Sequence, residues 1–191
     1  MRLESRDRQV LGETFLSRVI RRDDLIGLGF FGSVPRCNAR LLALKEEGYL
    51  RSKSHLGGAE LRAPLYICSA KGVRVAAAEL EIAPDEAIEA HRAGVRDLAI
   101  RHALKCTDLR LQFRRDLVDR ESLCLAEWSQ EFLCHHEFTT SGDRTVVIKP
   151  DGLAVLESEG RTHHLFIEAD LGNAALPKYR EKINRYRQYE A

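Results

Sequence analysis

The sequence predicts an α+β protein, and three observations support this class. The first part of its 191 residues places apolar side chains at helical spacing, with polar residues between them. A basic extended segment ending in a Gly-Gly pair follows, as in a hairpin. Toward the C-terminus, runs rich in β-branched residues alternate with Pro-Asp-Gly and Glu-Gly turns. We therefore expect helices first and strands later.

Composition excludes several classes of protein. A hydrophobic content of 44% and a charged content of 31% are typical of a globular chain. No apolar run approaches the roughly 18 residues that span a bilayer, and the N-terminus lacks the apolar core of a signal peptide. We therefore expect a cytoplasmic protein with no membrane partner. The five cysteines include no C-x-x-C pair, so we expect reduced, mostly buried thiols.

Charge is distributed unevenly along the chain. Residues 1–79 hold 14 Lys/Arg and 9 Asp/Glu, whereas residues 80–191 hold 16 and 20. A basic first part joined to an acidic second part favours a nucleic-acid-binding module attached to something else. Pro84 followed by two acids marks a break and a new helix start. The predicted domains are 1–82 and 83–191.

Three short helices are expected in the first module. Apolar residues at helical spacing fill 5–19, and the acids at 23–24 suit the start of a second helix. The third covers 33–47, with Pro35 in its first turn and Gly48 at its C-terminal end.

A basic hairpin completes the predicted winged-helix pattern. Residues 49–55 are extended and basic, Gly57-Gly58 forms a loop, and residues 61–69 return as a strand. In such a domain the third helix reads base edges in the major groove, and cations on the wing meet phosphates. The predicted DNA contacts are Arg36, Asn38, Arg40 and Lys45 on the helix and Arg51 and Lys53 on the wing. A helical domain that contacts protein remains the alternative.

Residues 70–80 suggest a further helix that packs on the first module. The second module begins with residues 85–104, which predict one long amphipathic helix, and continues with strands. Residues 124–133 fit either a strand or a short helix. Strands are expected on both sides of Pro150-Asp151-Gly152, and a basic helix with an aromatic stripe over 177–189.

Three acids lie at the ends of the last two predicted strands. LAVLES and HLFIEAD form an antiparallel pair around a turn at Glu159-Gly160, which returns Asp151 beside the end of the second strand. Alternate strand residues face one side, so Glu168 and Asp170 project together. Three converging carboxylates repel one another, and Mg²⁺ or Mn²⁺ would relieve that repulsion. Ordinary strand-end and turn acids remain the alternative.

Seven short motifs occur in a fixed order along the chain: R-D-R-Q-V-L, L-Y-I-C-S-A-K-G, V-R-D-L-A-I-R-H-A-L, W-S-Q-E, P-D-G-L, F-I-E-A-D-L-G and K-Y-R-E-K-I-N-R-Y. In the order of these motifs, the chain resembles the replication-relaxation family of plasmid and mobile-element proteins. The resemblance covers most of residues 6–189. It implies a winged-helix domain joined to a restriction-endonuclease-like core of the PD-(D/E)xK type. It also implies double-stranded DNA and plasmid replication or mobilisation proteins as partners.

The resemblance assigns roles to individual residues. Asp151 matches the PD acid and Glu168 the D/E position, whereas Asp170 falls where such a nuclease places lysine. Lys182 or Lys178 from the following helix is then the implied catalytic lysine. The chain stops at Ala191, where that core normally adds a strand. We therefore expect a shortened member that keeps DNA binding without cleavage.

Three hypotheses of function remain open. The first is a DNA-binding protein of plasmid or mobile-element replication, relaxation or mobilisation. The second is an active metal-dependent DNA endonuclease or nickase that uses Asp151, Glu168 and Asp170. The third is a winged-helix transcriptional regulator whose C-terminal domain forms a homodimer.

Overall fold

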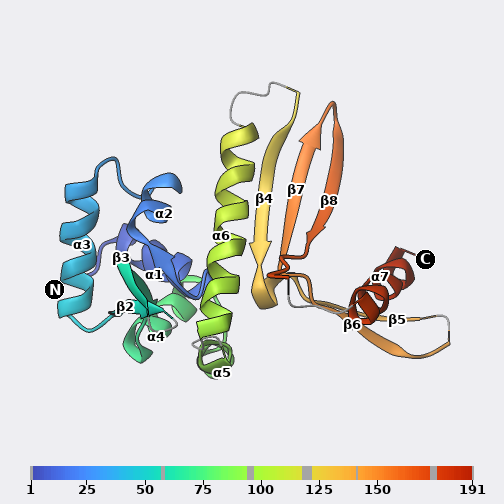
Figure 1. Ribbon diagram of the computed structural model, residues 1–191, viewed down its shortest axis with the longest axis horizontal. Coiled ribbons are helices and arrows are strands. Elements are labelled where there is room, and N and C mark those ends of the chain that lie inside the picture. The colour runs from blue at the N-terminus through green and yellow to red at the C-terminus, as the bar shows by residue number, and fades with distance from the viewer. Residues whose placement is uncertain are drawn as a thin grey trace. The chain divides into compact units, whose positions relative to one another are not determined.

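The structure is a computed structural model that describes residues 2–56, 59–93, 97–117, 122–140, 142–172 and 176–190 (Figure 1). Its helices and small antiparallel sheets confirm the predicted α+β class. The chain divides into two compact units, Met1–Leu111 and Gln112–Ala191. Among the described residues, no helix is both long and apolar enough to cross a membrane.

The three predicted helices of the first unit are confirmed. They are α1 (Ser5–Leu16), α2 (Arg22–Gly27) and α3 (Val34–Glu46). Two of them begin with a capping box. The Asp7 carboxylate accepts a hydrogen bond from the backbone N–H of Glu4 at 2.7 Å. The Asp24 carboxylate accepts one from the N–H of Arg21 at 2.8 Å. Each box satisfies a backbone donor that the helix itself leaves without a partner.

A three-stranded antiparallel sheet follows the helices. Its strands are β1 (Ile20–Arg21), β2 (Leu50–Leu56) and β3 (Ala59–Cys68), in the order β1-β3-β2. The predicted pairing of a basic strand with a returning strand is confirmed by β2 and β3. The predicted Gly57-Gly58 loop lies outside the described residues. Strand β1 has only two residues, too few for a periodic sequence signal.

The helix that follows the sheet approaches another segment of backbone closely. α4 (Ala70–Glu79) packs against α1. The Ser69 hydroxyl caps it by accepting hydrogen bonds from the N–H groups of Lys71 and Gly72, both at 3.1 Å. A Cβ atom at position 72 would lie 2.2 Å from the carbonyl oxygen of Tyr49. Glycine is therefore required where α4 meets the start of β2.

The prediction of one helix over residues 85–104 is wrong. The chain forms α5 (Pro84–Ala93) and α6 (Asp97–Leu117), and residues 94–96 lie outside the described part. The sequence has a glycine at position 94, and glycine costs about 1 kcal/mol in a helix interior relative to alanine. α6 also runs through part of 107–123, a segment whose sequence pattern predicted no element.

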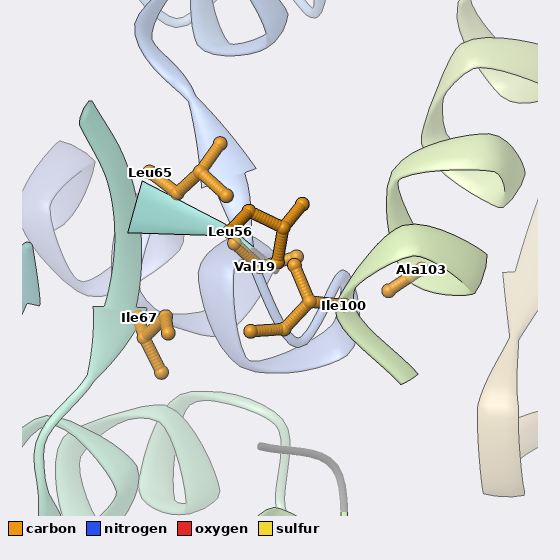
Figure 2. Close-up of a cluster of buried hydrophobic side chains, with 6 residues drawn as sticks. All are labelled: Val19, Leu56, Leu65, Ile67, Ile100 and Ala103. Atoms are coloured by element: carbon orange, nitrogen blue, oxygen red, sulfur yellow. The ribbon is translucent and has the colours of Figure 1, made fainter. Parts of the chain in front are cut away.

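One apolar cluster joins α6 to the sheet of the first unit. Its buried members are Val19, Leu56, Leu65, Ile67, Ile100 and Ala103. Figure 2 shows Ile100 of α6 directed toward Val19 and Leu56. Ile100 is 1% exposed, and fully burying a side chain of that size contributes about 1.5–3 kcal/mol. The first half of α6 is therefore part of the core of the first unit.

This packing bears on the division of the chain. The sequence predicts a boundary between residues 82 and 83, whereas the two compact units divide between Leu111 and Gln112, inside α6. Ile100 and Ala103 are the physical reason, because they place α6 in the first core. That residues 1–82 and 83–191 fold as independent domains stays a prediction.

The second unit is built mainly from short strands. Its elements after α6 are β4 (Cys124–Gln130), the 3-10 helix η1 (Glu131–Cys134), β5 (His136–Thr139), β6 (Thr145–Ile148), β7 (Gly152–Ser158), β8 (Arg161–Ile167) and α7 (Leu176–Glu190). Strands β4, β7 and β8 form one antiparallel sheet in the order β4-β7-β8, and β5 pairs with β6. Helix α7 contacts β6. Both sequence alternatives for 124–133 occur, since a strand leads directly into a 3-10 helix.

Buried ion pairs connect the helices of the first unit. The Asp7 carboxylate on α1 is 1% exposed and pairs with Arg40 on α3. Glu13 on α1 accepts a hydrogen bond from Arg110 on α6. Burial alone would raise the pKa of the Asp7 carboxyl. The hydrogen bonds from Arg40 and from the Glu4 N–H nevertheless hold that pKa below its usual value.

We expect Asp7→Asn to lower the free energy of unfolding by about 3 kcal/mol at pH 7, because it leaves a partly buried guanidinium without its counter-charge. The folded-state pKa of Asp7 lies below the unfolded value, so its stabilising effect is present above about pH 4 and is lost as pH falls through the folded pKa. The difference between wild type and variant should therefore shrink at pH 3. Urea unfolding followed by far-UV circular dichroism measures both values.

The matched control is Asp23→Asn, because the Asp23 side chain is 69% exposed and, among the described residues, pairs only with the neighbouring Arg22. It should change stability little at either pH. Equal effects of the two substitutions would contradict a structural role specific to Asp7.

Candidate functional site

The last two strands place two of the predicted site acids at one end of a hairpin. Strands β7 and β8 pair from Ser158↔Arg161 at the turn to Gly152↔Ile167 at the open end. Glu159 and Gly160 both have positive φ, 49° and 75°, which suits a tight two-residue turn. The predicted hairpin is confirmed. At the open end, Asp151 therefore directly precedes β7 and Glu168 directly follows β8.

Asp151 holds the two chain segments together at that end. Its N–H donates a hydrogen bond to the carbonyl of Ile167 at 2.9 Å, which extends the pairing beyond β7. Its carboxylate accepts a hydrogen bond from the N–H of Ala169 at 2.7 Å. Ala169 stands between Glu168 and Asp170, so this contact fixes the backbone that carries the other two acids.

Glu168 is engaged by two side chains of α7. Lys182 donates a hydrogen bond to Oε2, and the hydroxyl of Tyr186 donates one to Oε1 at 2.7 Å. Burial raises the pKa of Tyr186, and the hydrogen bond to Glu168 and the negative charges of Glu168 and Asp151 raise it further. Glu168 and Asp151 thus act on the same hydroxyl, and the structure brings Asp151, Glu168 and Lys182 into one neighbourhood.

Asp170 meets α7 at a different point. Its carboxylate accepts a hydrogen bond from the hydroxyl of Tyr179, and this contact is the largest cause of the raised pKa of that tyrosine. Strand β8 ends at Ile167, so strand alternation does not extend to residues 168–170. Instead Tyr179, Lys182 and Tyr186 share one face of α7, because they are three and four residues apart. Both acids after β8 therefore contact the same helix face.

Aromatic rings pack beside these polar contacts. The ring of Phe166 stacks on Tyr186 with centroids 5.1 Å apart and meets Tyr189 edge-on at 5.6 Å. Tyr189 also contacts His136 and Phe138, at 5.5 and 5.3 Å. The predicted aromatic stripe on this helix is confirmed for Tyr186 and Tyr189. The stripe holds the helix against strand residues of β5 and β8.

The structure does not show a prepared metal site at these acids. Within the described ranges, no group of three or more His, Cys, Asp or Glu side chains is placed to hold a metal ion. Both Glu168 oxygens are engaged by α7, one Asp151 oxygen by Ala169, and Asp170 by Tyr179. In this arrangement the acids do not fit a three-carboxylate site for Mg²⁺ or Mn²⁺. Metal binding stays a prediction.

The predicted recognition helix turns a mixed surface outward. Cys37, Leu41 and Leu44 are buried and anchor α3, whereas Arg36, Asn38 and Lys45 are exposed. At about 100° per residue, Arg36 lies roughly 160–180° around the axis from Asn38 and Lys45. The exposed cations therefore flank α3 on two sides. Ala39 and Leu42 lie between these flanks, and Leu42 is 52% exposed.

Arg40 differs from the other predicted contacts on α3. Its guanidinium pairs with the buried Asp7 carboxylate, and its side chain is 24% exposed. The pair connects two helices inside the first unit. The sequence showed Arg40 as one of several basic residues on one helix, and it contained no signal for a partner 33 residues earlier.

The two predicted wing residues lie on the side of the sheet that α5 and α6 cover. Arg51 pairs across the strands with Ile67, and Lys53 with Leu65, so each side chain shares a sheet face with a core residue. Arg51 is exposed, yet its charge is among the causes that lower the pKa of His91 on α5, after burial. Lys53 is half-buried. DNA contact by these six residues stays a prediction.

Fold and candidate site together define a class: an α+β protein with a basic helical first unit and a strand-rich second unit that ends in a basic helix. The chain belongs to the replication-relaxation family, whose model matches residues 9–191. This confirms the resemblance seen in the motif order and supports a role related to replication or mobilisation. No curated protein and no solved structure matches the chain.

We expect Tyr186→Phe to destabilise the second unit by about 1 kcal/mol, because it removes the hydroxyl that donates to Glu168 and keeps the stacked ring. The sole tryptophan, Trp128, lies in that unit, so urea unfolding followed by its fluorescence reports the change.

Tyr189→Phe is the matched control, since the Tyr189 hydroxyl makes no hydrogen bond within the described part of the chain. Its effect should stay within about 0.5 kcal/mol. If the two substitutions were equally mild, the contact between Tyr186 and Glu168 would be dispensable for α7 packing.

Proposed function

We propose that this chain is a DNA-binding protein of plasmid or mobile-element replication, relaxation or mobilisation, and that α3 contacts duplex DNA. The observation that carries the proposal is the outward surface of α3, where Arg36, Asn38 and Lys45 are exposed and have no charged or hydrogen-bonded partner among the described residues. Family membership supports the replication-related context. Plasmid replication or mobilisation proteins are the proposed partners.

The order of elements in the first unit supports a winged-helix interpretation. Three helices precede the β2–β3 hairpin, and α3 is the helix immediately before it. In winged-helix proteins this helix enters the major groove. Buried Cys37, Leu41 and Leu44 fix α3 to the unit, so its exposed side chains are held ready for contact.

The arrangement of side chains on α3 suits a groove with two phosphate walls. Arg36 and Lys45 lie on opposite flanks of the helix, where each reaches a different phosphate strand. Asn38 lies on the Lys45 side and is suited to bidentate hydrogen bonding with adenine. Ala39 and Leu42, between the flanks, fit apolar contact with thymine methyl groups. In this proposal Arg40 supports the helix through Asp7.

We expect Arg36→Gln and Lys45→Gln each to weaken duplex binding at all sequences and to reduce the slope of log K against log salt by about 1. Fluorescence anisotropy with a labelled duplex at 50–200 mM salt measures both quantities. Arg101→Gln is the control, because Arg101 is exposed on α6 and lies outside the proposed surface. Absence of duplex binding at low salt would overturn the proposal.

We propose metal-dependent nicking as a second candidate function, with Asp151 and Glu168 as its two acids and without the three-carboxylate site, which the described residues do not form. The contact between Glu168 and Lys182 supports it, because it pairs the proposed D/E acid with the lysine from the following helix. Asp151 acts on the same tyrosine as Glu168 and supplies the second acid of that neighbourhood.

If the chain nicks DNA, supercoiled plasmid should convert to the open-circular form with Mg²⁺ or Mn²⁺, and Asp151→Ala and Glu168→Gln should each lower the rate at least tenfold. Agarose gels measure the conversion, and circular dichroism confirms that the variants fold. No conversion across both metals and several plasmids would rule out this candidate and leave DNA binding unaffected.

A further inference from the structure

Positive charge in the second unit is concentrated on its last helix. Residues 176–190 contain five Lys/Arg and two Glu, a balance of +3, whereas residues 112–175 contain six Lys/Arg and twelve Asp/Glu, a balance of −6. α7 is thus a basic element in an otherwise acidic unit. Such segregation does not follow from a need for solubility, which a mixture of both signs would meet.

The two sides of α7 have different roles. Tyr179, Lys182 and Tyr186 face the acids after β8 and hold the helix in place. On the opposite side, Arg180, Asn184 and Arg187 are all exposed. They are four and three residues apart, so they form one continuous row along the helix.

Ion pairing divides the five cations of α7 into two groups. Lys182 pairs with Glu168, and Arg185 pairs with Glu181 on the same helix. Lys178, Arg180 and Arg187 have no ion-pair or hydrogen-bond partner within the described part of the chain. Two of these three unpaired cations belong to the outward row.

We propose that the outer face of α7, formed by Arg180, Asn184 and Arg187, binds the phosphate backbone of duplex DNA. This surface is distinct from α3 and would give each unit its own contact with the same partner. The inference deepens the proposed function and rests on duplex DNA as the ligand of this chain.

Charge complementarity favours a polyanion as the occupant. Arg180 and Arg187 are seven residues apart, so about 10 Å separates them along the axis. Duplex DNA carries one negative charge per about 1.7 Å of its axis, and several phosphates therefore lie within that span. Arginine binds phosphate with a planar, bidentate geometry, and Asn184 adds a neutral donor between the two cations.

The anchored side of the helix makes this surface effective. Hydrogen bonds to Glu168 and packing on Phe166 hold the backbone of α7, so only the outer side chains lose freedom on binding. Because one chain carries both contacts, binding through α3 raises the effective concentration of DNA at α7. Modest affinity at each surface then gives higher affinity in the full chain.

A second copy of the chain is the competing occupant. Leu176 and Ile183 border the basic row and are 74% and 50% exposed. Two apolar side chains form a small patch, and the unpaired arginines beside them would repel the same residues of an identical helix. The test therefore includes a measurement of oligomeric state.

The experiment compares full-length double variants by anisotropy with a labelled duplex across a salt series. Arg180→Gln combined with Arg187→Gln should reduce the slope of log K against log salt by about 2, at about 0.9 per lost phosphate contact. The control removes two charges elsewhere in the unit, with Arg144→Gln and Arg161→Gln, which are exposed near the turns of its two hairpins. Its slope should match that of the wild type.

The outcomes separate this inference from the proposed function. A changed slope for Arg36→Gln with Lys45→Gln, but not for the α7 pair, overturns the inference and leaves α3 as the interface. A changed slope for the α7 pair alone supports the inference and overturns the proposal that α3 contacts DNA. Equal changes for the α7 pair and its control overturn the inference, because net charge would then be the cause. A dimer in sedimentation velocity that Ile183→Asp dissociates, with an unchanged α7 slope, also overturns it.

Discussion

The position of α7 in the second unit depends on one carboxylate, that of Glu168, because both of its oxygens accept hydrogen bonds from side chains of this helix. Lys182 and Tyr186 meet that carboxylate, and Asp151 fixes the backbone beside it through Ala169. The polar contacts position α7, and the rings of Phe166 and Tyr189 fill the apolar side of the same junction. A single acid thus links the open end of the β7–β8 hairpin, the aromatic cluster and the basic helix. The outer face of α7 owes its orientation to this junction.

Much of the fold was predictable where local signals were strong. The turn at Glu159-Gly160 between two β-branched runs predicted the β7–β8 hairpin, because two residues with positive φ suit only a few side chains. The helices of the first unit were equally predictable from the spacing of apolar residues and from the residues at the helix ends. The failure over residues 85–104 has a physical origin. An amphipathic pattern indicates which side of a helix faces a core. It does not indicate whether one helix or two successive helices carry the pattern.

The candidate site was harder to predict from the sequence than the fold. The sequence indicated which acids cluster, since a hairpin must return Asp151 to Glu168. It did not indicate what neutralises them. The partners Lys182 and Tyr186 lie 14 and 18 residues further along the chain, on α7. Their four-residue spacing places both on one helix face, but the sequence does not indicate that this face meets Glu168. Arg40 is the same case in the first unit, because its partner Asp7 lies on another helix.

The pairing of Arg40 with Asp7 has a consequence for genetics. If α3 contacts DNA as proposed, substitutions of Arg36 and Arg40 would both reduce function in a cell, but for different reasons. If Arg36 contacts DNA as proposed, its loss would leave a normal amount of protein that functions poorly. Loss of Arg40 would leave the buried Asp7 carboxylate without its ion-pair partner, increase the unfolded fraction and lower abundance through proteolysis. Steady-state protein level, measured beside the phenotype, is therefore what distinguishes a residue that contacts a partner from one that supports the helix.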